Sequence, residues 1–249
     1  MVHTVWGDAA KAGRWRAHAD GKDYWRTPFL TPTDGRLDKG VIEPMAFLVE
    51  QDPDTTVSAH YHQADQFQVA VGGSGWLGRH AVRTGSVHYA NAFSPYGPVA
   101  AGPEGLDYFT LRNGWDPGAQ FLPGAIEALT AHKPKSNRQA MGDDFDLPSA
   151  DALQALHEGV SRPVIASEPD GLGAWLHLAG PDGEIAGQDP QYGYGQFWVV
   201  LLGSLGAEAL PPRSCVFVTP EEPALATRAG FGGVAVLELQ FPDRGWATP

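Results

Sequence analysis

The chain alternates between short apolar runs and turns rich in glycine and proline, a pattern typical of β proteins. The runs that begin at Gln66 (QFQVAVGGSG) and Gln196 (QFWVVLLGSLG) both read Gln-Phe-x-Val, then apolar residues, then Gly-Ser. Each is followed by a turn-marked apolar run, GSVHYANAFSPYG or RSCVFVTPEEPA, and then by a third run, LDYFTLR or GVAVLELQF. Because three runs recur in the same order just over half a chain apart, the sequence predicts a duplicated β architecture.

The segment between the two halves predicts a connector with one short helix. In LPSADALQALHEG, Ser149 is placed to cap a helix N-terminus, two leucines three residues apart share one face, and Gly159 is placed to end the helix. We therefore expect a helix near residues 149–158. The first 39 residues hold three tryptophans without clean alternation, and we expect them to pack as an irregular arm across a sheet.

Composition places the chain among globular proteins. Of 249 residues, 43% are hydrophobic and 18% are charged, so the chain can bury a substantial core. The formal net charge is −12, and the 17 lysines and arginines are spread along the sequence. A phosphate-binding face needs clustered basic residues, so we expect neither a nucleic acid nor an anionic membrane as a partner.

Cysteine content and hydropathy favour a cytoplasmic protein. Cys215 is the only cysteine, which rules out an intramolecular disulfide, and its apolar neighbours predict a buried, inert thiol. The N-terminal stretch lacks the apolar region of a signal peptide, and no apolar run reaches membrane-spanning length.

Candidate chemistry lies in the stretch AHYHQADQFQVAVGGSG, residues 59–75. Side chains alternate along a strand, so His60 and His62 share one face. Two imidazoles on one face and the side-chain oxygen of Gln66 would give three converging metal ligands with open positions for water or substrate. A strand that has a polar face and binds no metal is the alternative, and residue types alone leave both open.

The spacing in this stretch resembles the first motif of the cupin superfamily. That motif reads Gly, five residues, His-x-His, three or four residues, Glu, six residues, Gly. Here His60 and His62 are followed at the right spacing by Gln66 and Gly73, and Asp54 stands where the motif opens with Gly. A neutral amide oxygen binds metal more weakly than the carboxylate of the usual Glu.

The second cupin motif is matched only in part. It reads Gly, five residues, Pro-x-Gly, two residues, His. After Gly85 the Pro-x-Gly is Pro95-Tyr96-Gly97, four residues later than in the family, and Ala100 stands where the fourth ligand is expected. His88 lies on the preceding strand, and we expect it to complete the site if its face points inward.

The resemblance implies an all-β fold, a double-stranded β-helix (jelly-roll cupin) duplicated as a bicupin. The expected organisation is an N-terminal arm at 1–39, a first barrel with the metal site at 40–115, a connector with a short helix at 116–164, and a second, degenerate barrel at 165–249. In the second half DPQYGYG stands where histidines would fall, so that barrel is expected to be structural, with His177 as a packing or surface residue.

The resemblance further implies a divalent transition metal (iron, manganese, nickel or zinc) and dioxygenase, isomerase or lyase chemistry on a small organic molecule. The expected metal ligands are His60, His62, Gln66 and His88. The expected catalytic residues are His88, as an alternative to its ligand role, and Tyr96. Tyr89 and Gln68 are candidates for orienting substrate, and Asp65 for supporting a ligating imidazole.

Two other functions remain open from the sequence. One is a bicupin that binds a small ligand in an aromatic barrel without metal and without turnover. The other is a storage-like structural role, which suits the duplication but not the retained histidines. The nearly continuous apolar run FWVVLL, residues 197–202, fits burial on both faces and modestly favours a homodimer.

Overall fold

A computed structural model describes residues 3–32, 41–132 and 137–243 and divides the chain into two compact units. The first unit spans Gly13–Met141. The second unit combines Met1–Ala12 with Gly142–Pro249, so it takes its chain from both ends of the sequence. No helix in the described part of the chain is both long and apolar enough to cross a bilayer.

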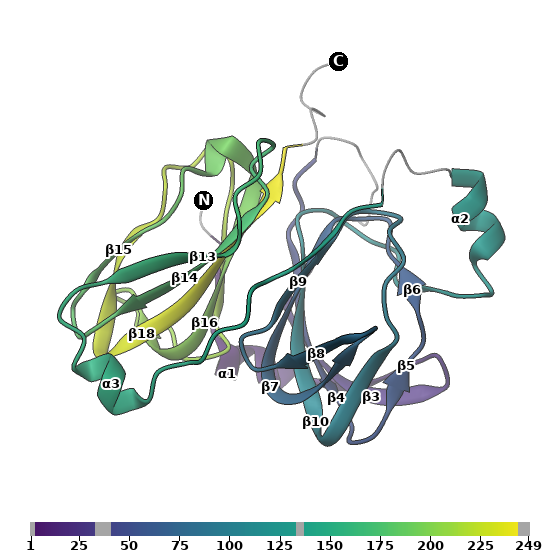
Figure 1. Ribbon diagram of the computed structural model, residues 1–249, viewed down its shortest axis with the longest axis horizontal. Coiled ribbons are helices and arrows are strands. Elements are labelled where there is room, and N and C mark those ends of the chain that lie inside the picture. Colours follow the sequence, from purple (N-terminus) through teal and green to yellow (C-terminus); the bar gives the residue numbers. More distant parts are fainter. Residues whose placement is uncertain (1–2, 33–40, 133–136, 244–249) are drawn as a thin grey trace. The chain divides into compact units, whose positions relative to one another are not determined.

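The first unit is almost entirely strands (Figure 1). Its elements are β2 (Trp15–Ala19), β3 (Lys22–Leu30), β4 (Met45–Gln51), β5 (Thr56–Val57), β6 (His60–Tyr61), β7 (Gln66–Leu77), β8 (His80–Arg83), β9 (Val87–Ala90), β10 (Val99–Arg112), β11 (Gln120–Phe121), α2 (Ile126–His132) and β12 (Gln139–Met141).

The second unit has the same character, with a few short helical turns. Its elements are β1 (His3–Val5), α1 (Gly7–Ala10), the 3₁₀ turn η1 (Lys11–Gly13), whose last residue belongs to the first unit, α3 (Ala150–Gln154), β13 (Val160–Ile165), β14 (Gly173–Ala179), β15 (Glu184–Ala186), the 3₁₀ turn η2 (Pro190–Tyr192), β16 (Gly193–Leu205), β17 (Cys215–Val218) and β18 (Ala226–Pro242).

The two main sheets have matching strand orders. The first runs β12-β9-β7-β10-β4-β3-β2, and the second runs β1-β17-β16-β18-β14-β13. Every pairing along both paths is antiparallel. The first six strands therefore correspond one to one, and β2 is an addition to the first sheet. This correspondence confirms the all-β class and the duplicated architecture.

The match extends to individual residues. Gln66 on β7 lies directly across from Arg112 on β10, and Gln196 on β16 lies directly across from Gln240 on β18. The two Gln-Phe pairs therefore occupy equivalent places in the two sheets. The residue across from the glutamine is an arginine in the first unit and a glutamine in the second.

The N-terminal segment differs from the expected irregular arm. β1 pairs with β17 and forms the edge of the second sheet, whereas β2 and β3 form a hairpin that extends the first sheet beyond β4. The first sheet thus begins well before residue 40 and closes with β12, inside the segment that we expected to be a connector. Residues 33–40 lie outside the described part of the chain.

The predicted connecting helix exists but is shorter than expected. Ser149 caps α3, accepting a hydrogen bond from the backbone N–H of Ala152, and Leu153 is buried. The helix nevertheless ends at Gln154 and not near residue 158. The carbonyl oxygen of Leu156 packs so closely against Gly180 that a Cβ there would lie 2.0 Å from it. This contact with the sheet, which the sequence pattern does not reveal, redirects the chain.

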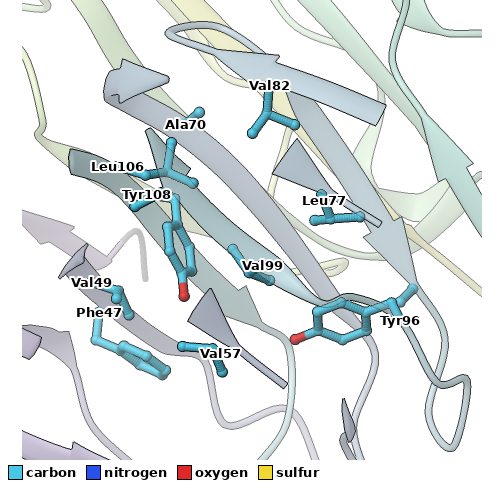
Figure 2. Packing of buried hydrophobic residues seen from close by; sticks show 12 residues of the cluster. Phe47, Val49, Val57, Ala70, Leu77, Val82, Tyr96, Val99, Leu106 and Tyr108 are labelled. Atoms are coloured by element: carbon cyan, nitrogen blue, oxygen red, sulfur yellow. The ribbon is translucent and has the colours of Figure 1, made fainter. Parts of the chain in front are cut away.

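Apolar side chains fill the interior of each unit. In the first unit a cluster that includes Phe47, Val49, Leu106 and Tyr108 packs between the strands, and Figure 2 shows the Tyr108 hydroxyl turned into this cluster. In the second unit residues 197–200 are fully buried within their own sheet. Burial inside the unit accounts for their apolar character, so the homodimer stays a prediction.

Gly73 at the end of the first motif is required by its backbone. Its φ is +66°, and a Cβ at this position would lie 2.1 Å from the carbonyl oxygen of Gly105 on the paired strand. Asp54, where the family motif has glycine, also has a positive φ of 56°. The first and last positions of the motif therefore have left-handed backbone conformations, whereas the positions between them include the candidate ligands.

We predict that Gly73→Ala destabilises the protein by clearly more than the ~1–2 kcal/mol that a left-handed alanine costs, because the methyl group collides with backbone. Gly21→Ala is the matched control, since Gly21 has a φ of +68° with nothing within 4 Å of its Cβ position. Urea unfolding midpoints measure both. Equal losses in the two variants would contradict the close-approach explanation.

Candidate functional site in the first unit

The two sequence motifs meet through a short backbone pairing. His60 on the two-residue strand β6 pairs with Tyr96, which lies in the Pro-Tyr-Gly turn. The N–H of His60 donates to the carbonyl of Tyr96 at 3.0 Å, and the N–H of Tyr96 donates to the carbonyl of His60 at 2.9 Å. This reciprocal pair brings the second-motif tyrosine against the first-motif histidine.

His60 is buried and neutral. Its Nδ1 lies 2.7 Å from the carbonyl oxygen of Ser58, which can only accept, so Nδ1 carries the hydrogen and Nε2 has the lone pair. Nε2 lies 2.8 Å from the Tyr96 hydroxyl and accepts its hydrogen. Burial, followed by the charge of Arg112, lowers the pKa of His60, although the Ser58 hydrogen bond acts in the opposite direction.

Gln66 and Tyr96 continue this chain of hydrogen bonds. The Gln66 Nε2 amide donates to the Tyr96 hydroxyl oxygen at 2.5 Å, while the hydroxyl hydrogen is directed to His60. Burial raises the pKa of Tyr96, so the phenol keeps its proton. The amide oxygen of Gln66 consequently points away from Tyr96.

Arg112 receives that amide oxygen. Its Nε and Nη2 lie 3.1 Å and 3.0 Å from Gln66 Oε1, so one oxygen accepts from both arms of the guanidinium. Arg112 is only 2% exposed, and its Nη1 lies 3.3 Å from Oδ1 of Asp116. The carboxylate balances the buried positive charge.

His62 joins the cluster through the same two charged residues. Its Nδ1 donates to Asp116 Oδ1 at 2.8 Å, and Arg112 Nη2 lies 3.0 Å from Nδ1 and 3.2 Å from Nε2. Because Nη2 is nearly equidistant from the two ring nitrogens, it lies against the face of the His62 ring and not along the in-plane lone pair of Nε2. Burial and then the charge of Arg112 lower the pKa of His62 to about 3, despite Asp116.

The pKa of Asp116 is lowered. Burial alone would raise it, but Arg112 and His62 outweigh that effect, and the backbone N–H of Gln63 adds a hydrogen bond at 2.7 Å. Asp116 is therefore a carboxylate held by an arginine, an imidazole and a backbone amide. It fixes the orientation of His62.

His88 also lies near Tyr96. The ring centroid of Tyr96 is 4.5 Å from that of His60 and 5.2 Å from that of His88. The two ring nitrogens of His88 face side-chain oxygens, with Nδ1 3.1 Å from Gln68 Oε1 and Nε2 3.3 Å from Gln139 Oε1. Burial lowers the pKa of His88 to about 4, so the ring is neutral at pH 7 and carries one N–H for these two neighbours.

Next to His88 the interior holds a small cavity. Its volume is about 20 Å³, enough for about one water molecule. Its walls are mainly apolar, include the polar residues Gln68, Ser86 and His88, and contain no charged group. The lining residues are Gln68, Ala70, Leu77, Val82, Ser86, Val87, His88, Val99, Leu106, Tyr108 and Met141.

The arrangement of the expected metal ligands does not fit a divalent ion. The lone pair of Gln66 Oε1 is directed at Arg112, that of His60 Nε2 is directed at Tyr96, and the Arg112 cation lies against the His62 ring. His88 faces Gln68 and Gln139. In residues 3–32, 41–132 and 137–243, no group of three or more His, Cys, Asp or Glu side chains could hold a metal ion.

The structure therefore brings His60, His62, Gln66 and Tyr96 together, and His88 packs near the Tyr96 ring. Asp65 accepts from the Tyr89 hydroxyl and the Ala92 N–H. The partner of the imidazole is Asp116. Gln68 does line the cavity, as a substrate-orienting residue would.

Arg112 and Asp116 were missed by sequence reasoning. Arg112 ends the run LDYFTLR, where a charged residue after an apolar strand is ordinarily solvated. A signal did exist, since Arg112 ends a strand of the duplicated set and Asp116 lies four residues further on.

The described part of the second unit (residues 3–12 and 142–243) holds no equivalent centre. His177 packs in the interior, stacked on Trp198 at 5.1 Å between ring centroids and 2.8 Å from Glu238 Oε2. Burial raises the pKa of Glu238, although His177 acts against it. His177 is thus a packing residue, as expected, and Cys215 is fully buried with a pKa raised by burial.

Comparison with known proteins shows similarity in fold. No protein-family profile and no curated sequence matches the chain. Among solved structures, a proposed dioxygenase from Nostoc punctiforme has a TM-score of 0.60 at 14% identity, covering 98% of this chain and 80% of that chain. An 11S globulin from Wrightia tinctoria with an auxin binding site has a TM-score of 0.58 at 11% identity, covering 98% and 84%.

Oxalate decarboxylase from Bacillus subtilis, which has Mn(II) centres, has a TM-score of 0.55 at 12% identity and covers 94% of this chain and 77% of that chain. All three similarities extend over nearly the whole chain, so they concern both units together. At such low sequence identities these similarities establish the architecture only, and the chemistry has to be inferred from the residues of the site.

We predict that His88 makes stability depend on pH between about 6.5 and 4. The unfolded histidine takes up a proton below its pKa of about 6.5, whereas folded His88 stays neutral until about pH 4. Stability is thus lost as pH falls, by about 2 kcal/mol at pH 5 for this group. His88→Gln should reduce the loss between pH 8 and pH 5 by that amount in urea titrations.

His80→Gln is the control, because His80 is an exposed histidine on the neighbouring strand β8. Identical pH profiles for His88→Gln and the wild type would contradict the prediction.

Proposed function

Because the chain has the two-barrel cupin fold, we propose that it is a cupin enzyme acting on a small organic molecule in the first unit. The observation that carries the proposal is the cavity beside His88, which lies against the buried polar cluster formed by the two motifs. The equivalent part of the second unit is filled by the stacked His177 and Trp198.

The cavity walls indicate the chemical class of the molecule. They are mainly apolar, and none of the lining residues is Arg, Lys, Asp or Glu. A charged ligand would lose its hydration there without gaining a counter-ion. The walls therefore suit a neutral, mostly apolar molecule with one hydrogen-bonding group that faces His88 and Gln68.

Entry requires a side chain to move, since the cavity as it stands admits about one water. Met141 is the wall residue best placed to do so. It has an unbranched, flexible side chain and lies on β12, a three-residue strand paired with β9 at the sheet edge.

His88 is the group that can exchange a proton with the bound molecule. The Gln139 Nε2 amide donates to the carbonyl of Pro95 at 2.7 Å, which directs Gln139 Oε1 at His88 Nε2. Nε2 then carries the hydrogen, and Nδ1 has a lone pair that accepts from Gln68 once the Gln68 amide is turned so that its Nε2, and not its Oε1, faces the ring. A pKa of about 4 makes His88 a weak base and, once protonated, a strong acid.

Isomerase and lyase chemistry fit these residues best. Both reaction classes can proceed by proton transfer, which His88 supplies with Tyr96 behind it. Dioxygenase chemistry would need a metal or another redox group, whereas the lone pairs of His60 and Gln66 are already engaged by Tyr96 and Arg112 and the Arg112 cation lies against the His62 ring. The metal dependence of the fold neighbours is therefore not carried over to this site.

A second candidate is a cupin that binds such a molecule without turnover. It is favoured by the completeness of the polar cluster, in which the facing atoms of His60, His62 and Gln66 all have protein partners. The two candidates share the cavity and differ only in whether His88 moves a proton.

We predict that a neutral probe such as benzyl alcohol binds more tightly than benzoate or benzylamine, and that Met141→Ala tightens binding of the alcohol roughly tenfold by removing the side chain that closes the cavity. His88→Leu should weaken it about as much, and His80→Leu should leave it unchanged. Ligand-observed NMR titration measures all four proteins. If a charged probe binds more tightly than the alcohol, or if His88→Leu binds the alcohol as tightly as the wild type does, the proposed site is wrong.

Turnover is tested with the compounds that bind. Incubation in D₂O should exchange a C–H of a substrate for C–D at a rate that His88→Leu lowers by roughly 10²-fold or more, as followed by proton NMR. Binding without exchange across neutral compounds with an acidic C–H would favour the second candidate.

A further inference from the structure

The guanidinium of Arg112 lies where the expected metal ligands converge. Gln66 Oε1 accepts from its Nη2 at 3.0 Å, and the same Nη2 lies against the His62 ring, 3.0 Å from Nδ1 and 3.2 Å from Nε2. Arg112 Nε makes a second contact to the same Gln66 oxygen at 3.1 Å. An amide oxygen and an imidazole nitrogen are donors that also bind first-row metals. Here they bind an organic cation that belongs to the chain.

The positive charge at this position is already balanced by a carboxylate. Arg112 is buried and permanently positive, and Asp116 Oδ1, 3.3 Å from its Nη1, supplies the compensating negative charge. A divalent ion held by His62 and Gln66 would lie next to the guanidinium, and repulsion between the two cations in a buried site is strong. The site accommodates one cation or the other.

Arg112 also determines how the neighbouring hydrogen bonds run. Because it takes the Gln66 oxygen, the Gln66 amide must donate to Tyr96, Tyr96 must donate to His60, and His60 must donate to a backbone carbonyl. Glutamine suits this position better than the family's glutamate, since a carboxylate has no N–H for Tyr96. The departure of the first motif from the family is thus linked to the arginine.

The second unit provides an internal comparison. Gln240 stands at the place equivalent to Arg112, directly across from Gln196, and accepts a hydrogen bond from its Nε2 at 2.7 Å. The fold therefore needs only a polar partner at this place. A cation there is particular to the first unit, the unit that retains the two histidines.

We infer that Arg112 is the built-in cation of the first unit: its guanidinium takes the place of a divalent metal among His62 and Gln66, and it positions both residues together with Tyr96. The centre is complete without metal. Arg112 acts through its neighbours as a positioning residue and not as a catalytic one.

Metal binding by the wild-type protein is the first test and requires no variant. Untagged protein produced in medium supplemented with manganese, iron, nickel and zinc should contain less than ~0.1 equivalent of any of them by elemental analysis, in line with a donor set that is already occupied. Calorimetric titration with Mn²⁺ or Ni²⁺ should show no stoichiometric binding. About one equivalent of metal that His62→Ala removes would overturn the inference.

The converse test creates the missing site. The double variant Arg112→Met, Gln66→Glu removes the cation and adds a carboxylate. It should bind Ni²⁺ at least ~100-fold more tightly than the wild type, because a direct metal ligand changes affinity by more than a residue that only supports a ligand. Adding His60→Ala should abolish this gain. A folded double variant that binds Ni²⁺ no better than the wild type would count against the inference.

The positioning role is tested by Arg112→Lys, which keeps the charge but loses the planar fork that holds Gln66. The ring ¹⁵N shifts of His60 should report an Nδ1–H tautomer in the wild type and should change in this variant. Arg26→Lys is the control, because Arg26 is an arginine of the same sheet whose guanidinium lies 3.7 Å from the ring centroid of Phe47. Unchanged His60 shifts in a folded Arg112→Lys protein would refute the role. Neither outcome depends on ligand binding beside His88, so the proposed function can fail separately.

Discussion

The register of β7 against β10 is the constraint on which the polar interior of the first unit depends. It sets Gln66 directly across from Arg112, and alternation along both strands turns these side chains to the same face. A slip of one residue by either strand would carry its side chain to the opposite face and separate Gln66 from Arg112. The register is held by buried neighbours such as Phe67 and Leu111, which are fully inaccessible and lie across from each other one position further along.

Burying an arginine is costly unless its charge and its hydrogen bonds are met. The first unit meets them with groups from three separate segments, namely Gln66 on β7, His62 just after β6, and Asp116 beyond β10. Removal of any one would leave a buried polar group unpaired. The cluster therefore behaves as one unit of structure, and the small cavity beside His88 has a rigid wall on the Tyr96 side.

Local pattern was enough to predict the parts of this arrangement that lie close together in sequence. The spacing from His60 to Gly73 placed three members of the cluster, because one strand, one turn and one strand connect them. Asp116 was not predictable in the same way, since the segment that carries it has no regular pattern and reaches His62 only through the fold. For His88 the sequence could give the strand but not its contacts, because Tyr96 and Gln139 reach it only through the fold. The helix at α3 was predicted by its cap, and its early end was set by Gly180, a residue on another part of the sheet.

The edge strand β1 has a consequence for how the protein is made. Residues 3–5 are synthesised before the first sheet, whereas their partners at 215–217 are synthesised after it. The nascent chain must keep this short segment unpaired while the whole first sheet forms, and the second sheet gains this edge only after residue 217 has been made. A contact of such long sequence separation closes slowly. Until it closes, β17 presents an open edge that can pair wrongly with another strand.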